Sequence, residues 1–282
     1  MFTFATTHLI VDVLGFFDEV AGGVATAGRF VPTTPVRATD TRSPTTPTTT
    51  VYTRVRVGAD DVVNGPILGR WGIGTATSAV AVIVTGLAGS GADSGFVVAL
   101  PKGGSTPESS NVNTNGSGDI RANLVVVPVG ADGSIDLRLT TTADVLVDIV
   151  GSFTDGSAPA LNDGTYRLIS PTRVVDTRSA LGFVRPAAGG VGSVDPAVVP
   201  NGALAVSHNI VVTETGGYGY LTAYPSGATT VPVVSNCNAT GPGQTRSAMG
   251  ITVLGGGSVS YYVSTGTHVI VDVTGYFNHG TT

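Results

Sequence analysis

The chain repeats itself, and this repeat constrains its fold more than any other feature. An apolar ten-residue segment with a central aspartate occurs three times, at residues 8–17, 144–153 and 268–277. A second motif, Arg-x-x-Asp-Thr-Arg, occurs twice, at residues 37–42 and 173–178. The Arg-x-x-Asp-Thr-Arg motif opens a module and the apolar segment ends it. Three endings and two openings therefore predict two complete modules, preceded by the final strand of a third.

The positions of these two motifs also predict the domain boundaries. The two modules are expected at residues 28–153 and 164–278. Residues 1–27 then hold the extra terminal strand and a connecting segment, and the polar residues 154–163, with one glycine and one proline, form a linker. A chain of 282 residues is long enough for two domains that each bury a core.

Strand and turn signals dominate within the modules. The chain has 40 glycines and only 12% charged residues, a composition that suits strands and turns better than helices. Apolar residues alternate with polar ones over residues 51–57 and 135–139, and residues 79–84, 96–100 and 145–150 are apolar runs of strand length. These patterns predict half-buried strands and central core strands.

Residues 124–129 and 135–139 flank the turn signal Ala-Asp-Gly at 131–133 and are expected to form a hairpin. We therefore predict an all-β protein made of two tandem antiparallel β-sandwich domains, jelly-roll-like, with an extra N-terminal strand. The choice between a plain sandwich and a jelly roll stays open. A β-solenoid fits poorly, because its repeats are roughly 20 to 50 residues long.

Charge and hydropathy exclude several classes of partner. The formal net charge is −5, and the cationic residues include a single lysine, Lys102, so the basic surface of a nucleic-acid-binding protein is not expected. No apolar stretch approaches the roughly 20 residues that a membrane-spanning helix needs. The one cysteine, Cys237, cannot form an internal disulfide.

The charged residues of the opening motif are the first candidates for a specific role. An aspartate and an arginine two positions apart on an extended segment project toward the same side. They can form a ligand site, or they can pair with each other and fix how the first segment of the module closes on its body. The residues concerned are Arg37, Asp40 and Arg42 in the first module and Arg173, Asp176 and Arg178 in the second.

The repeated ending carries its own aspartate, at Asp12, Asp148 and Asp272. Each lies among apolar strand residues, where an unpaired carboxylate is costly to bury. We expect each to pair with one of the recurring arginines. A calcium site is the alternative, but no cluster has EF-hand-like spacing, and neither a metal nor another cofactor is predicted.

The residues that could support catalysis do not follow the repeat. The chain has four histidines, at His8, His208, His268 and His279. His8 and His268 occupy equivalent positions, but the middle copy has Asp144 there, so a required base is not expected. Cys237 aligns with Val112 and should be a small core residue. We therefore expect no catalytic site and no enzyme activity.

Tyrosines concentrate in the second module. An aromatic ring offers an apolar face on which a sugar can stack, and it is equally an ordinary partner in a sheet. The sequence leaves both roles open. The candidate glycan contacts are Tyr218, Tyr220 and Tyr224, with Tyr261 and Tyr262 nearby in the same module.

Taken together, these motifs resemble a module that is repeated in large secreted and surface proteins of actinobacteria. The resemblance rests on the Arg-x-x-Asp-Thr-Arg opening, the Val-Asp-Val-x-Gly-Tyr-Phe ending, and the segments Tyr-Pro-Ser-Gly at 224–227 and Ser-Asn-Cys-Asn at 235–238. It covers almost the whole chain, although the first copy departs from it at residues 100–103 and at Ser152. It implies an exported protein, secreted or at the cell surface, and assigns no activity to the module.

The sequence leaves two functions open. The first is a non-catalytic structural or adhesive repeat. Its extra strand at residues 7–17 either packs onto the first module or adds to the sheet of a neighbouring copy, producing head-to-tail filaments. The second is a carbohydrate-binding module for cell-envelope polysaccharide. A hydrolase is the least favoured function, because the resemblance implies only that such modules often accompany extracellular enzyme domains in the same protein.

Overall fold

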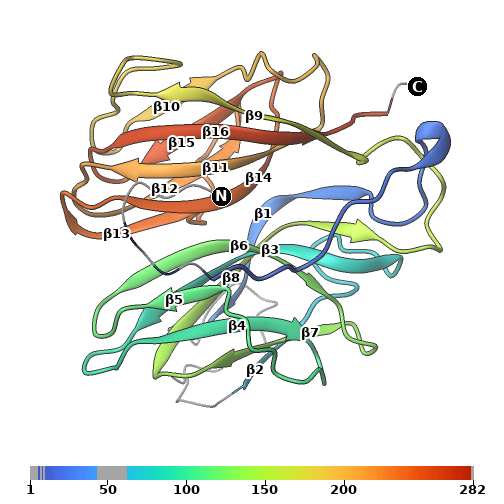
Figure 1. The fold of residues 1–282 in the computed structure, drawn as a ribbon, viewed down its shortest axis with the longest axis horizontal. Coiled ribbons are helices and arrows are strands. Elements are labelled where there is room, and N and C mark those ends of the chain that lie inside the picture. The colour runs from blue at the N-terminus through green and yellow to red at the C-terminus, as the bar shows by residue number, and fades with distance from the viewer. Residues whose placement is uncertain (1–5, 7, 9, 43–61, 281–282) are drawn as a thin grey trace.

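Sixteen β-strands and one turn of 3-10 helix form the described part of the chain (Figure 1). The computed structural model describes residues 6, 8, 10–42 and 62–280. The strand predicted at residues 51–57 lies outside the described residues. The strands of the first module are β1 (Phe30–Asp40), β2 (Val62–Pro66), β3 (Thr77–Ala88), β4 (Gly95–Pro101), β5 (Val112–Thr114), β6 (Ile120–Pro128), β7 (Ser134–Leu139) and β8 (Ala143–Thr154). Those of the second are β9 (Tyr166–Asp176), β10 (Val191–Val194), β11 (Ala205–Thr213), β12 (Gly216–Pro225), β13 (Cys237–Pro242), β14 (Arg246–Val253), β15 (Val259–Val263) and β16 (His268–Phe277).

The two modules have the same topology. In the first, the sheets have the strand orders β1-β8-β3-β6 and β2-β7-β4-β5; in the second, β9-β16-β11-β14 and β10-β15-β12-β13. The pairings are antiparallel. Eight strands in this arrangement form a jelly roll. The prediction of two tandem antiparallel β-sandwiches is confirmed, and the topology that the sequence left open is that of the jelly roll.

The repeated ending segments form the central strands β8 and β16. Each pairs with the opening strand of its module on one side and with β3 or β11 on the other. The motif glycines are required because an aromatic ring of the opening strand packs on them: a Cβ at Gly151 would collide with Phe30, and one at Gly275 with Tyr166. Both faces of β8 are buried, which explains its nearly continuous apolar sequence.

The second module packs on the outer face of the β1-β8-β3-β6 sheet. It contributes the ends of β11 and β16, and its edge strands β13 and β14 contact β6. Phe277 of the second module lies with its ring centroid 4.7 Å from Phe30 and 6.1 Å from Phe153 of the first. The same apolar cluster contains Ile83 and Ala205. Because the second module covers its outer face, β8 is buried along its whole length.

The outer faces differ in chemistry at equivalent positions. In the first module Ala81 and Ile83 point outward and are buried at the junction. The strand registers align them with Ser207 and Asn209 of the second module. The outer face of the second module is therefore the more polar of the two.

Arg29 fastens the linker to the start of β1. Its side chain is buried, and it donates hydrogen bonds to the carbonyl oxygens of Asp163 and Pro159, both at 3.0 Å. The backbone N–H of Phe30 also donates to the carbonyl of Gly164 at 2.8 Å. The two modules are thus held together by linker contacts as well as by the apolar cluster.

The N-terminal segment does not form the expected strand. Residues 10–20, which we call the arm, have no regular secondary structure, and the side chains of Ile10, Val13 and Phe16 are largely exposed. Phe17 contacts the body: its ring stacks on Tyr166 at 4.4 Å and lies 6.0 Å from Phe153 and 6.3 Å from Phe277. Within the described residues no strand pairs with the arm, and β1 and β9 each pair on one side with the ending strand of their own module.

The expected hairpin at residues 124–139 is also wrong. The turn is present, with the N–H of Gly133 bonded to the carbonyl of Gly130 at 2.8 Å. However, β6 and β7 belong to opposite sheets of the sandwich. The segment therefore crosses from one sheet to the other, as the jelly-roll topology requires.

Candidate functional site

The opening motif and the ending aspartate of the first module form one network of ion pairs. Arg37 donates to both carboxylate oxygens of Asp148, and its Nη1 donates to Asp40 at 3.2 Å. Arg42 binds the same Asp40 from the other side, with Nε and Nη2 at 3.0 and 2.8 Å from its two oxygens. Two arginines and two carboxylates therefore compensate each other's charge.

The second module repeats this network atom for atom. Arg173 donates from Nε and Nη2 to the two oxygens of Asp272 at 2.8 and 3.1 Å, and from Nη1 to Asp176 at 3.3 Å. Arg178 donates to the two oxygens of Asp176 at 2.9 and 2.7 Å. These bonds from Arg178 hold the pKa of Asp176 down to about 2. Asp12, the third ending aspartate, is exposed on the arm.

The threonine of the motif attaches the opening to the ending strand. The Oγ1 of Thr41 accepts a hydrogen bond from the N–H of Val145 at 2.9 Å and donates one to Asp144 at 3.0 Å. In the second module Thr177 accepts the equivalent bond from Val269 at 2.9 Å, and its hydroxyl lies 2.9 Å from Nδ1 of His268. The Asp-Thr-Arg sequence thus joins the opening strand to the ending strand in each jelly roll. His268 contacts the motif threonine as Asp144 does in the first module.

The two networks differ in burial. The side chains of Arg37 and Asp148 are 14% and 0% exposed, against 45% and 24% for Arg173 and Asp272. The network of the first module is more buried because the second module covers it: the Val233 carbonyl accepts a hydrogen bond from Arg37 Nη2 at 3.1 Å. Burial raises the pKa of Asp148 to about 6, against the opposing effect of Arg37.

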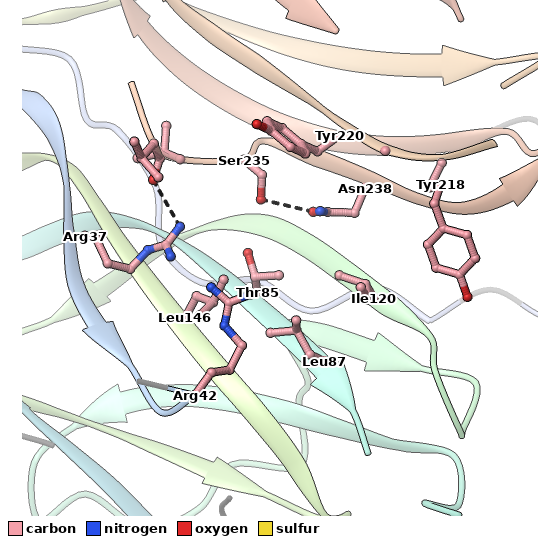
Figure 2. A pocket seen from close by; sticks show the side chains of 14 residues that line it. Arg37, Arg42, Thr85, Leu87, Ile120, Leu146, Tyr218, Tyr220, Ser235 and Asn238 are labelled. Carbon is pink, nitrogen blue, oxygen red and sulfur yellow. Dashed lines mark hydrogen bonds between the residues drawn. The ribbon is translucent and has the colours of Figure 1, made fainter. Parts of the chain in front are cut away.

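A groove of about 280 Å³ opens between the modules beside the buried network (Figure 2). From the first module it is lined by Arg37, Arg42, Thr85, Leu87, Ile120 and Leu146. From the second it is lined by Tyr218, Gly219, Tyr220, Val233, Val234, Ser235, Asn238 and Ala239. The groove is composite, because neither module provides both walls.

The floor of the groove holds a hydroxyl with an unused hydrogen-bonding capacity. Thr85 is 1% exposed, and among the described residues its Oγ1 has no hydrogen-bond partner. Figure 2 shows this hydroxyl directed toward the second module, where Ser235 donates to Asn238 at 3.2 Å. A buried hydroxyl without a partner is costly, so a ligand atom or water that bonds to it is stabilised there.

Two of the three candidate tyrosines form the opposite wall. The side chains of Tyr218 and Tyr220 are 68% and 41% exposed, and the Tyr220 ring lies 5.9 Å from that of Tyr262. Tyr224 does not line the groove, since it is buried. The strand registers place Tyr224 at the position of Leu100 in the first module, which makes it a packing residue.

The histidines and the cysteine are placed apart from the groove. His208 is fully buried, with Nδ1 2.9 Å from the Tyr261 hydroxyl and Nε2 3.1 Å from that of Thr252, and burial lowers its pKa to about 3. Burial raises the pKa of the Cys237 thiol to about 12. The described part of the chain contains no group of three His, Cys, Asp or Glu side chains that could hold a metal ion.

No helix within the described ranges is long and apolar enough to cross a membrane. No model of a protein family matches the chain, and no curated protein matches it. A solved structure that is similar to it is the N-terminal CBM22-1–CBM22-2 tandem domain of Xyn10C from Paenibacillus barcinonensis. The two are 12% identical, with a TM-score of 0.24, and the likeness covers 90% of this chain and 99% of that one.

Proposed function

We propose that this protein is a non-catalytic binding protein of the cell surface or extracellular space, and that it binds a glycan in the groove between its modules. The observation that carries the proposal is the pairing of Tyr218 and Tyr220 with the unpartnered hydroxyl of Thr85 across that groove. Saccharides present apolar faces and hydroxyl edges, so a ring wall opposite a polar floor is complementary to them.

The fold supports the proposal by keeping the two walls in place. The apolar cluster at Phe277, the Arg29 contacts to the linker and the bond from Arg37 to Val233 all join the modules. A groove held open in this way loses little conformational freedom when a ligand enters, which favours binding.

The test is a glycan array probed with the whole chain and with Tyr218→Ala and Tyr220→Ala variants. Phe96→Ala is the matched control, because the strand registers align Phe96 with Tyr220 and it lies in the first module, outside the groove. Binding that is lost in the tyrosine variants and retained in the control supports the proposal. An array without any bound glycan, or binding that ignores both tyrosines, overturns it.

A second candidate function is head-to-tail assembly through the arm. The observation that favours it is the exposure of Ile10, Val13, Leu14 and Phe16 on a segment that has the sequence of a central strand. An acceptor of such a strand in another copy would have to be a sheet edge, and β9 is an edge strand in which only Val175 and Asp176 are buried.

Assembly is tested by measuring mass in solution over a range of concentrations, for the whole chain and for a chain without residues 1–17. Leu14→Asp provides a milder change of the same segment. Oligomers that disappear in both variants support assembly. A monomeric whole chain, or oligomers that survive the deletion, contradict it.

A further inference from the structure

We propose that the groove selects saccharides that carry a carboxylate, and that Arg42 is the residue that recognises it. The inference rests on the glycan-binding function proposed above and names the class of glycan. It is carried by the charge of the groove wall, by the fixed orientation of Arg42 and by the contrast with the equivalent network of the second module.

The groove is locally cationic in an acidic protein. The chain has a formal net charge of −5, yet the described residues that line the groove include Arg37 and Arg42 and no aspartate or glutamate. The carboxylates that balance these arginines, Asp40 and Asp148, are buried behind them, with side chains 7% and 0% exposed. An anionic group in the groove therefore meets the guanidinium groups before it meets the carboxylates.

Arg42 is the more accessible of the two arginines and is already oriented. Its side chain is 47% exposed, while Arg37 is 14% exposed. Two bonds to Asp40 fix the plane of the Arg42 guanidinium, and Figure 2 shows it directed toward Thr85 and Leu146 at the floor of the groove. A held guanidinium loses little side-chain entropy when it binds a second carboxylate, and the N–H groups of Nη1 and Nη2 that Asp40 does not use remain as donors to it.

The remaining contacts fit an acidic sugar. The faces of Tyr218 and Tyr220 can carry the pyranose ring, while Ser235, Asn238 and Thr85 offer hydroxyl and amide groups to its hydroxyls. A carboxylate on the ring edge that faces the first module would then reach Arg42. A neutral sugar could make the stacking and hydroxyl contacts but would leave the Arg42 donors that Asp40 does not use without an anionic ligand.

The second module supplies an internal control. Arg178 makes the same bonds to Asp176 and is 46% exposed, but it lines no part of the groove. Arg178→Gln and Arg42→Gln therefore remove the same structural bond in equivalent places. A difference in ligand binding between them reports on the groove and not on folding.

The experiment is titration calorimetry with oligogalacturonate and oligoglucuronate, and with the same oligosaccharides after reduction of each carboxyl group to an alcohol. A charge-assisted hydrogen bond corresponds to about tenfold or more in affinity. We expect the acidic member of at least one pair to bind about tenfold more tightly than its reduced form. This preference should weaken as salt is raised, because salt screens partly exposed charges.

The Arg42→Gln variant should bind both members of that pair equally, and Arg178→Gln should keep the preference of the unmodified chain. Equal binding of acidic and reduced forms by the unmodified chain overturns the role of the carboxylate and leaves glycan binding intact, as does array binding confined to neutral glycans. Loss of the preference in Arg178→Gln as well assigns the effect to folding and overturns the role of Arg42. An array without any bound glycan removes the proposed function itself.

Discussion

Arg37 and Asp148 form a two-point ion pair between the opening and ending strands of the first module, and the carboxylate of this pair is inaccessible to solvent. The equivalent pair of Arg173 and Asp272 has the same bonds but faces water. One sequence motif thus occurs in two dielectric environments within a single molecule, and the strength of an ion pair depends strongly on that environment.

Removing the arginine should therefore have different costs in the two modules. We expect Arg37→Met to lower the free energy of unfolding by about 3–5 kcal/mol, because it leaves Asp148 buried without its partner. Arg173→Met should cost about 1 kcal/mol or less, because water replaces the lost partner. Chemical denaturation of both variants measures the difference, and equal losses would contradict the role assigned to the second module in burying the pair.

The buried His208 should make stability depend on pH. Its pKa falls from the ordinary 6.5 to about 3 in the folded protein, so between these values the unfolded chain takes up a proton that the folded chain does not. Stability should then fall as pH drops below about 6.5, by about 1.4 kcal/mol per pH unit from this residue.

The variant His208→Val tests this, since Val82 occupies the equivalent position in the first module. At pH 7.5 the variant should be less stable by about 1–3 kcal/mol, because the hydroxyls of Tyr261 and Thr252 lose their partner. Urea unfolding at several pH values down to 4.5 should show the gap between the two proteins narrowing. Parallel pH profiles would contradict a neutral, buried His208.

The single thiol should be inert in the folded protein. Cys237 is 2% exposed, and burial raises its pKa to about 12, so the reactive thiolate is scarcely populated at pH 8. We expect a disulfide-exchange reagent to modify it only as fast as the chain unfolds. The control is the same reaction in denaturant, which should be complete, and rapid native-state labelling would refute the burial.

The arm should be held by the aromatic contacts of Phe17. Phe17→Ala removes the stack on Tyr166 and should lower the free energy of unfolding by about 1 kcal/mol while speeding proteolytic cleavage between residues 10 and 20. The neighbouring Phe16 is 87% exposed, so Phe16→Ala should change neither quantity. Identical behaviour of the two variants would contradict the anchoring role of Phe17.

The repeat made much of the fold predictable. It predicted two tandem β-sandwiches, identified residues 144–153 and 268–277 as strands, and led to the expectation that Asp148 and Asp272 need arginine partners, which Arg37 and Arg173 provide. It failed for the arm, because a strand sequence specifies a strand only where neighbouring strands are available. Nothing fills the space beside Gly15, whereas aromatic rings crowd the equivalent glycines.

The groove was not predictable from the pattern of residues. Its walls come from Arg42 and Tyr220, which lie far apart in the sequence and meet only because the modules pack in one orientation. The tyrosines were identified as candidates, but their exposure depends on that packing. For Tyr224 a signal was available, since the repeat aligns it with Leu100 in an apolar run, and that alignment indicates a core position.

The equivalent positions Ile83 and Asn209 differ in polarity, so the two copies of the module do not have interchangeable outer faces. A charge introduced at Ile83 would be buried in the apolar cluster between the modules, whereas Asn209 is half-buried and lies near polar side chains such as Asn123 and Arg121. Tolerance measured in one copy therefore does not transfer to the other.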